Sequence, residues 1–302
     1  MNTSNLIKEF DLSPYLLASK AFAEGGEGCL FEGKLKSSSS YLNNKKRKLE
    51  ENKEGQEKEE LIAVKIYKKD PYIEKGSFMQ EATLQYELKH PLLLPILGII
   101  QSKEAIVYPR LYGSLGDYIQ EYKKISSFEQ HLSMAKNMVE SVVFLHSRNL
   151  IHKDLGLNNF LVDKKDKVNK VVLADLSTVS NVSSKENLQD IGNPTGCIEF
   201  CAPELFNNYH PNPVPASKAS DIYALSISLW CLFSMKIPYN STNLRTDSQI
   251  ERHVLKGGRL PFSRSIPLVI REMISSGWNH IPEKRITAEE MKNILYSNFI
   301  FS

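Results

Sequence analysis

The sequence contains no long apolar run, few cysteines and no marked excess of charge of either sign. No apolar stretch reaches the length of about 20 residues that a bilayer-spanning helix needs, so we expect no membrane span. Residues 1–10 lack the apolar core of a signal peptide, so we expect no leader there. The formal net charge of +3 is too small to indicate nucleic-acid binding.

The four cysteines follow neither a metal-ligand spacing nor the spacing of a disulfide framework: they are Cys29, Cys197, Cys201 and Cys231. We therefore expect reduced thiols and a cytoplasmic protein. A nuclear location is the alternative, because residues 45–48 form a short basic run. A run of this kind is more often a solvated surface than a targeting signal.

The sequence does have the composition of a globular protein, 41% hydrophobic and 24% charged. A chain of 302 residues can form one large or two small domains with ample core. Function must therefore be inferred from motifs.

The most informative motif lies in residues 150–162, where His152, Asp154 and Asn159 follow the pattern H-x-D-L-x-x-x-N and run into an apolar strand. This stretch resembles the catalytic loop of protein kinases. The resemblance implies that Asp154 accepts or orients the proton of the attacking hydroxyl and that Asn159 gives an oxygen to Mg²⁺. Taken alone, the pattern is also compatible with a chance match or with an N-capping aspartate.

Residues 15–33 indicate two strands around a glycine-rich turn. Ala23, Gly25, Gly28 and Leu30 occupy the marked places of the kinase pattern G-x-G-x-x-G-x-V, with Ala23 as a departure from it. Glycines let the backbone approach phosphates and point N–H groups at them. A plain hairpin rich in glycine would look the same, so this match gains its weight from the motifs later in the chain.

The strand at residues 61–67 resembles the kinase V-A-I-K strand, and a helix is expected at residues 78–89. The resemblance implies that Lys65 bridges the α- and β-phosphates of ATP and that Ala63 lines the nucleotide site. It also implies that Glu81, on the αC helix of kinases, pairs with Lys65. The alternative is an exposed helical glutamate.

Strands are expected at residues 96–100 and 104–108, followed by a segment that resembles the kinase hinge. The resemblance makes Tyr108 the gatekeeper and brings the backbone of residues 109–111, including Pro109 and Leu111, to adenine. Leu161, just after the catalytic loop, is also expected to contact the nucleotide.

A strong helical pattern covers residues 127–148, and a buried strand at residues 171–174 ends in Asp175-Leu176-Ser177. This tripeptide resembles D-F-G, which implies that Asp175 is the main magnesium ligand. Residues 196–204 resemble G-T-x-x-[YF]-x-A-P-E. Asp221 matches the kinase aspartate that braces the catalytic loop, Arg285 the arginine that pairs with Glu204, and residues 287–290 form a capping box.

The resemblance covers residues 15–298 and is closest to the tyrosine-kinase-like kinases, which mostly phosphorylate serine and threonine. It implies an α+β fold of two lobes: a small, mostly antiparallel β lobe with the αC helix, and a larger, mainly helical lobe. We assign residues 1–14 to an N-terminal extension, 15–108 to the small lobe, 109–113 to the hinge and 114–298 to the large lobe. Residues 36–60, polar and poor in apolar residues, are expected to be a disordered insertion.

The implied cofactors are ATP and Mg²⁺, and the implied partners are protein substrates or a regulatory protein. Four supporting positions depart from the family's pattern. One is Asn158, because the arginine that tyrosine kinases place in this loop stands at neither Gly156 nor Asn158. Gly156 replaces the lysine of Ser/Thr kinases, Cys197 replaces a threonine, and Lys153 replaces an arginine. Two hypotheses result: a Ser/Thr kinase of modest activity, or a pseudokinase that acts as a nucleotide-binding scaffold or switch.

Overall fold

The computed structural model describes ten segments of the chain: residues 7–13, 15–24, 27–35, 61–68, 77–122, 127–163, 169–184, 196–206, 214–240 and 244–299. The chain forms two compact units, Met1–Arg110 and Leu111–Ser302, and their boundary falls within the predicted hinge. Gly25, the predicted insertion at residues 36–60 and its basic run at residues 45–48 lie outside the described residues.

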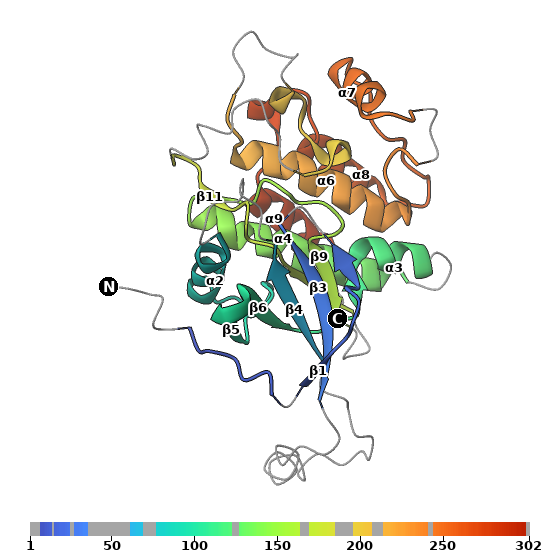
Figure 1. Cartoon of the computed structure of the whole chain (residues 1–302). Coiled ribbons are helices and arrows are strands. Elements are labelled where there is room, and N and C mark those ends of the chain that lie inside the picture. The colour runs from blue at the N-terminus through green and yellow to red at the C-terminus, as the bar shows by residue number, and fades with distance from the viewer. Residues whose placement is uncertain are drawn as a thin grey trace. The chain divides into compact units, whose positions relative to one another are not determined.

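The first unit is built on an antiparallel sheet in the order β1-β3-β4-β6-β5, with β2 paired to β3 (Figure 1). Its strands are β1 (Tyr15–Leu17), β2 (Ala23–Glu24), β3 (Gly28–Leu35), β4 (Leu61–Tyr67), β5 (Gly98–Ile100) and β6 (Ala105–Pro109). Side chains alternate between the two faces of a strand. On β4, Ile62 and Val64 therefore join a buried apolar cluster on one face, while Lys65 points to the other.

The helix α2 (Ser77–Glu87) packs against the sheet by a face that mixes apolar and polar residues. Phe78, Glu81, Ala82 and Gln85 are all buried, and their spacing of three and four residues defines one side of a helix. Two of these four are polar, which explains why the apolar periodicity of this segment is weak in the sequence.

Residues that precede β1 also belong to the packed structure. Glu9 forms a parallel bridge with Ile99 on β5, and the Phe10 N–H donates to the Ile99 carbonyl at 2.7 Å. Ile7 is buried, and Phe10 and Leu12 pack against the apolar cluster of the sheet. Residues 7–12, assigned to the N-terminal extension, thus line the outer edge of β5.

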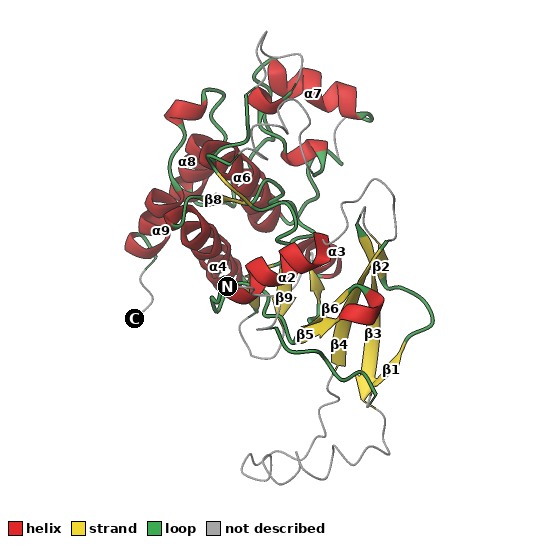
Figure 2. Cartoon of the chain, turned by 60° about the vertical axis from the view of Figure 1, so that its left-hand side comes forward, coloured by secondary structure: helices red, strands yellow, loops and turns green. Residues whose placement is uncertain are grey.

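The second unit is mainly helical (Figure 2). Its α-helices are α3 (Leu115–Glu121), α4 (Phe128–Ser147), α6 (Lys218–Ser234), α7 (Asp247–Leu255), α8 (Leu268–Gly277) and α9 (Ala288–Ser297). Its short strands are β7 (Gly113–Ser114), β8 (Leu150–Ile151), β9 (Phe160–Asp163), β10 (Lys170–Leu173) and β11 (Ser180–Asn181). They form a sheet in the order β10-β9-β7 and a pair β11-β8.

The helix α6 is the core of this unit, as its nearly uniform apolarity predicts. Every residue from Ser220 to Phe233 is buried. Capping boxes start α4 at Ser127 and α9 at Thr287, and the second of these confirms the box predicted at residues 287–290. In the part of the chain that the structure describes, no helix is both long and apolar enough to cross a membrane.

Candidate active site

Strand pairing places five of the predicted nucleotide-contacting residues of the first unit on one face of its sheet. Leu30 on β3 lies opposite Ala23 on β2 and opposite Lys65 on β4. Tyr108 on β6 lies opposite Ala63 on β4. Paired residues point to the same face, and so do residues two apart on a strand. These five side chains therefore share the face that carries Lys65.

Gly28 lies in the same sheet, where it allows a close approach between strands. A Cβ atom at this position would lie 2.6 Å from the Ile66 carbonyl oxygen, which is too close for any side chain. The sequence motif implies that this glycine lets the backbone approach a phosphate. The structure shows a second reason for glycine, because the neighbouring strand β4 leaves no room for a side chain.

Lys65 and Glu81 form the ion pair that the resemblance implies. The Lys65 Nζ lies 2.8 Å from the Glu81 Oε2, and the two side chains are only 12% and 1% exposed. A second carboxylate, that of Glu27 in the glycine-rich turn, lies 3.6 Å from the same Nζ. The alternative interpretation of Glu81 as an exposed helical residue is wrong.

Glu81 has two further donors that the sequence analysis missed. The hydroxyls of Tyr67 and Tyr108 both donate to its carboxylate, Tyr67 to Oε2 and Tyr108 to Oε1. Tyr108 also contacts the Gln85 Oε1 at 3.2 Å. The only sequence signal for this network is that Tyr67 lies two residues after Lys65 and so on the same face of β4.

The predicted hinge residues are divided between the two units. Pro109 ends β6 and has no N–H, and the Arg110 N–H donates to the Leu61 carbonyl at 3.1 Å. Neither residue therefore offers a backbone donor to a ligand. Leu111 begins the second unit, in which Leu161 on β9 lies opposite Ser114 on β7.

In the second unit, the loop between β8 and β9 brings Asp154 and Asn159 together. The Asn159 Nδ2 donates to the Asp154 backbone oxygen at 2.8 Å and to its Oδ2 at 2.9 Å. Because both amide hydrogens point toward Asp154, the Asn159 Oδ1 points away from it. An oxygen in that position can serve as a ligand for a hard cation such as Mg²⁺.

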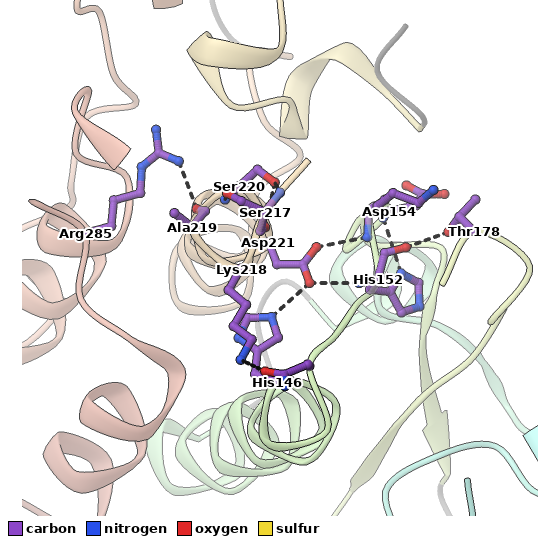
Figure 3. Close-up of polar contacts among 12 residues, drawn as sticks. His146, His152, Asp154, Thr178, Ser217, Lys218, Ala219, Ser220, Asp221 and Arg285 are labelled. Atoms are coloured by element: carbon purple, nitrogen blue, oxygen red, sulfur yellow. Dashed lines mark hydrogen bonds and ion pairs between the residues drawn. The ribbon is translucent and has the colours of Figure 1, made fainter. Parts of the chain in front are cut away.

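Asp221 on α6 braces this loop, which confirms the prediction for that residue (Figure 3). Its Oδ2 accepts from the His152 N–H at 2.8 Å, and its Oδ1 accepts from the Lys153 N–H at 2.9 Å. The His146 ring, at the end of α4, lies 2.9 Å from the same Oδ2. The buried carboxylate thus ties two helices to the catalytic loop.

His152 connects the loop to the strand that leads to Asp175. Its Nδ1 accepts from the Asp154 N–H at 3.3 Å, and its Nε2 contacts the Ala174 carbonyl at 3.1 Å. Thr178, another residue that the sequence analysis missed, donates its hydroxyl to the His152 carbonyl at 2.6 Å. Asp175 itself has a φ of 57°, a left-handed conformation that aspartate tolerates better than most residues.

The electrostatics of the site disfavour the charge on Asp154. Burial raises the pKa of its carboxyl above the ordinary value, and the nearby Asp175 carboxylate adds to this shift. The hydrogen bond from Asn159 opposes it. The Asp175 carboxylate and the Asn159 amide oxygen are ligand types that suit Mg²⁺, and a divalent cation held by them would offset the repulsion between Asp175 and Asp154.

Gly196 and Cys197 lie against Asp154. Gly196 has a φ of 85°, and a Cβ atom there would lie 2.3 Å from the Asp154 Oδ1, so only glycine fits. Cys197 lines a small pocket together with Asp154 and Lys153. Gly156 differs from Gly196, because a Cβ on it would make ordinary contacts of 3.6 Å with Phe200 and 3.7 Å with the Asp154 Oδ1.

The pairing predicted between Arg285 and Glu204 is confirmed. Two guanidinium nitrogens lie 2.6 Å from the two carboxylate oxygens in a buried, bidentate arrangement. Arg285 also donates to the carbonyls of Asn279 and Ala219. This pair anchors the end of the segment that begins at Asp175.

An antiparallel sheet with a buried lysine–glutamate pair, and a helical unit with a braced aspartate–asparagine loop, define a protein kinase domain. Comparison with known sequences agrees: the family described as protein tyrosine and serine/threonine kinase matches residues 19–295, and the chain belongs to it. The predicted α+β, two-lobed kinase fold is thereby confirmed.

Individual relatives include both tyrosine and serine/threonine kinases. The chain is 30% identical over 234 residues to the human cytoplasmic tyrosine-protein kinase BMX, which covers 76% of this chain and 33% of BMX. It is 28% identical over 246 residues to the Arabidopsis thaliana serine/threonine-protein kinase CTR1, a match that covers 78% of this chain and 28% of CTR1. It is 26% identical to the rat serine/threonine-protein kinase TNNI3K, over 76% of this chain and 28% of TNNI3K. The chain thus spans about a third of these relatives' length.

Proposed function

We propose that this protein transfers the γ-phosphate of ATP to serine or threonine residues of protein substrates, with modest activity. The observation that carries the proposal is the position of Asp154. Asn159 holds its carboxylate and Asp221 holds the backbone on which it lies. A carboxylate fixed in this way can accept the proton of an attacking hydroxyl.

The other residues have supporting roles. Lys65, held by Glu81, would bind the α- and β-phosphates, and Asp175 and the Asn159 Oδ1 would hold Mg²⁺. When bound, the metal neutralises charge on the phosphates. Ala23, Leu30, Ala63 and Tyr108 would line the nucleotide site from the sheet of the first unit.

The raised pKa of Asp154 fits a proton acceptor, because a base is most effective when its pKa approaches the working pH. Its ionised form is needed for this step. Activity should therefore decline as the pH falls through the raised pKa.

The second candidate is a pseudokinase that binds nucleotide as a scaffold or switch. It is favoured by Gly156, which has no side-chain cation where Ser/Thr kinases carry a lysine, and by Cys197, which lines a pocket with Asp154 and stands where those kinases carry a threonine. A missing interaction worth about 3 kcal/mol in the transition state would slow transfer by roughly two orders of magnitude.

The test is transfer of labelled phosphate from Mg-ATP to a generic basic protein, with the native chain and Asp154→Asn side by side. Asparagine keeps the shape of the side chain and its contact with Asn159 but cannot accept the proton. We expect slow transfer by the native protein and none by the variant. Equal background from both, together with stabilisation of both by Mg-ATP in thermal melts, would favour the scaffold.

A further inference from the structure

Two tyrosines of the first unit are positioned to control the lysine–glutamate pair. Tyr67 and Tyr108 lie on neighbouring strands, β4 and β6, and both point to the face that α2 covers. Glu81, which is 3% exposed, receives both hydroxyls and the Lys65 ammonium on its two oxygens. A buried carboxylate is stable as an anion only when donors of this kind surround it.

The two tyrosines act on the pair in different ways. Tyr67 donates to the same oxygen as Lys65, and the Lys65 Nζ lies 4.9 Å from the centre of the Tyr67 ring, within range of a cation–π interaction. Tyr108 takes the other oxygen at 3.1 Å, and its hydroxyl also contacts Gln85, one turn later on α2.

Gln85 extends this network beyond the helix. Its Nε2 donates to the carbonyl of Leu94 at 2.5 Å, in the segment that joins α2 to β5. The helix is therefore held at two buried positions on one face, Glu81 and Gln85, both of which contact Tyr108.

We propose that Tyr67 and Tyr108 are positioning residues that hold Glu81 against Lys65 through their phenolic hydroxyls. This role rests on the proposed function, because it matters for catalysis only if Lys65 binds the phosphates of ATP. With both hydroxyls in place, the Lys65–Glu81 ion pair forms within the first unit before any nucleotide binds. A hydrogen bond to a charged group contributes roughly a factor of ten or more to such an equilibrium.

The test compares Tyr67→Phe, Tyr108→Phe and the double variant with the native protein. Phenylalanine keeps the ring and removes only the hydroxyl. Tyr118→Phe is the matched control, since this tyrosine is fully buried and its hydroxyl has no hydrogen-bond partner in the described part of the chain. Melting temperatures of the single variants show whether each remains folded.

The first readout needs no kinase activity. Acetic anhydride acetylates lysine amines. Mass spectrometry of the peptide that contains Lys65 gives the rate at which Lys65 is acetylated, and the exposed Lys34 serves as the internal reference. We expect the double variant to label about tenfold faster at Lys65, with faster hydrogen exchange along α2 and no change in Tyr118→Phe. Native rates at Lys65 and α2 in the double variant would overturn the proposal.

The second readout is steady-state phosphate transfer. We expect kcat to fall about tenfold in the double variant while KM for the protein substrate stays unchanged, because the substrate does not contact this network. An unchanged kcat alongside faster Lys65 labelling would overturn the positioning role. If the native protein transfers no phosphate, the proposed function fails, and the labelling and exchange still decide whether the tyrosines hold Glu81.

Discussion

At the scale of single residues, Asp154 combines a cost in stability with the chemical role that we propose for it. It is surrounded by groups that fix its geometry, yet burial and Asp175 both raise its pKa and so disfavour the charge that a proton acceptor needs. Side chains kept in surroundings that disfavour their charge are common where chemistry depends on them. The cost and the use can be measured separately.

The stability cost predicts that Asp154→Asn unfolds less readily than the native protein at pH 7. With a folded-state pKa raised above the ordinary 3.8, the carboxyl holds its proton more tightly when folded, so ionisation destabilises the fold. This cost is absent below the unfolded-state pKa and grows as the pH rises through the folded-state pKa. The gain in Asp154→Asn should therefore shrink as the pH falls.

Urea unfolding between about pH 4 and pH 8 measures this gain, because the cost begins to grow just above the ordinary pKa of 3.8. Glu272→Gln is the control, because Glu272 is an exposed carboxylate in the middle of α8 in the same unit. It should show little change in the free energy of unfolding across the range. A variant at position 154 that is less stable than the native protein at pH 7 would contradict the argument.

A substitution at Gly156 is expected to raise activity, whereas Asp154→Asn is expected to abolish it. Its φ lies outside the left-handed region and a Cβ would meet only ordinary contacts, so Gly156→Lys fits without strain and brings an ammonium close to Asp154. We expect the rate of phosphate transfer to rise about ten- to hundredfold. Gly156→Met, of similar length without charge, should leave the rate unchanged, and equal rates for both variants would show that charge is not limiting.

The residues with proposed roles in the catalytic loop were accessible to sequence analysis because their spacing is local. Asn159 comes five residues after Asp154 in the sequence, and one loop holds both. Tyr108 and Glu81 lie 27 residues apart, and Thr178 lies 26 residues beyond His152. Such contacts depend on how strands and helices pack, which residue patterns do not specify.

At the scale of elements, the segment before β1 is the main addition that the structure makes. Strand addition along β5 gives residues 8–10 backbone partners, and Ile7, Phe10 and Leu12 add apolar contacts. Sequence analysis placed the start of the lobe at residue 15 because the first predicted strand begins there, and no periodicity marks the short stretch before it. The capped helix α4, with its long apolar face, was predicted within a residue at each end.

The contact between this segment and β5 can be tested through Gly98. A Cβ there would lie 2.7 Å from the Lys8 carbonyl oxygen and 3.1 Å from the Phe10 Cβ. We expect Gly98→Ala to destabilise the full chain by about 1–3 kcal/mol, since a backbone must move. In a chain that starts at residue 14 the same change should be neutral or stabilising, because alanine reduces the entropy of the unfolded state.

This double comparison isolates the contact from any intrinsic effect of alanine in a strand. The measurement is the free energy of unfolding by urea for the four chains. Equal losses with and without residues 1–13 would mean that Gly98 serves the strand itself and that the N-terminal segment contributes nothing at this point.

At the scale of the whole molecule, motif order identified the two-lobed fold, because the motifs succeed one another from Ala23 to Arg285 as they do in kinases. The prediction that residues 36–60 are a disordered insertion rests on composition alone, because this segment contains too few apolar side chains to form a core. The structure adds the geometry of the ends of this insertion. Lys34 on β3 lies opposite Leu61 on β4, so the residues that flank the insertion are neighbours in an antiparallel pair.

This register predicts that a short Gly/Ser turn can replace the 25 residues from 36 to 60 without loss of stability. Antiparallel neighbours are close enough for a hairpin turn to join them. Closing a loop of four residues in place of 25 reduces the entropic cost by roughly 1–2 kcal/mol, so the melting temperature should stay level or rise slightly. Stabilisation by Mg-ATP should persist, because Lys65 and Glu81 keep their places.

The matched control keeps the length of the insertion and scrambles its order, which preserves composition and loop entropy while removing any specific contact. We expect the scrambled chain and the native chain to melt at the same temperature. A loss of several degrees in both the shortened and the scrambled chains would mean that residues 36–60 pack against the fold through their particular sequence. A loss in the shortened chain alone would mean that a short turn strains β3 and β4, and that their ends need a longer connection than the register implies.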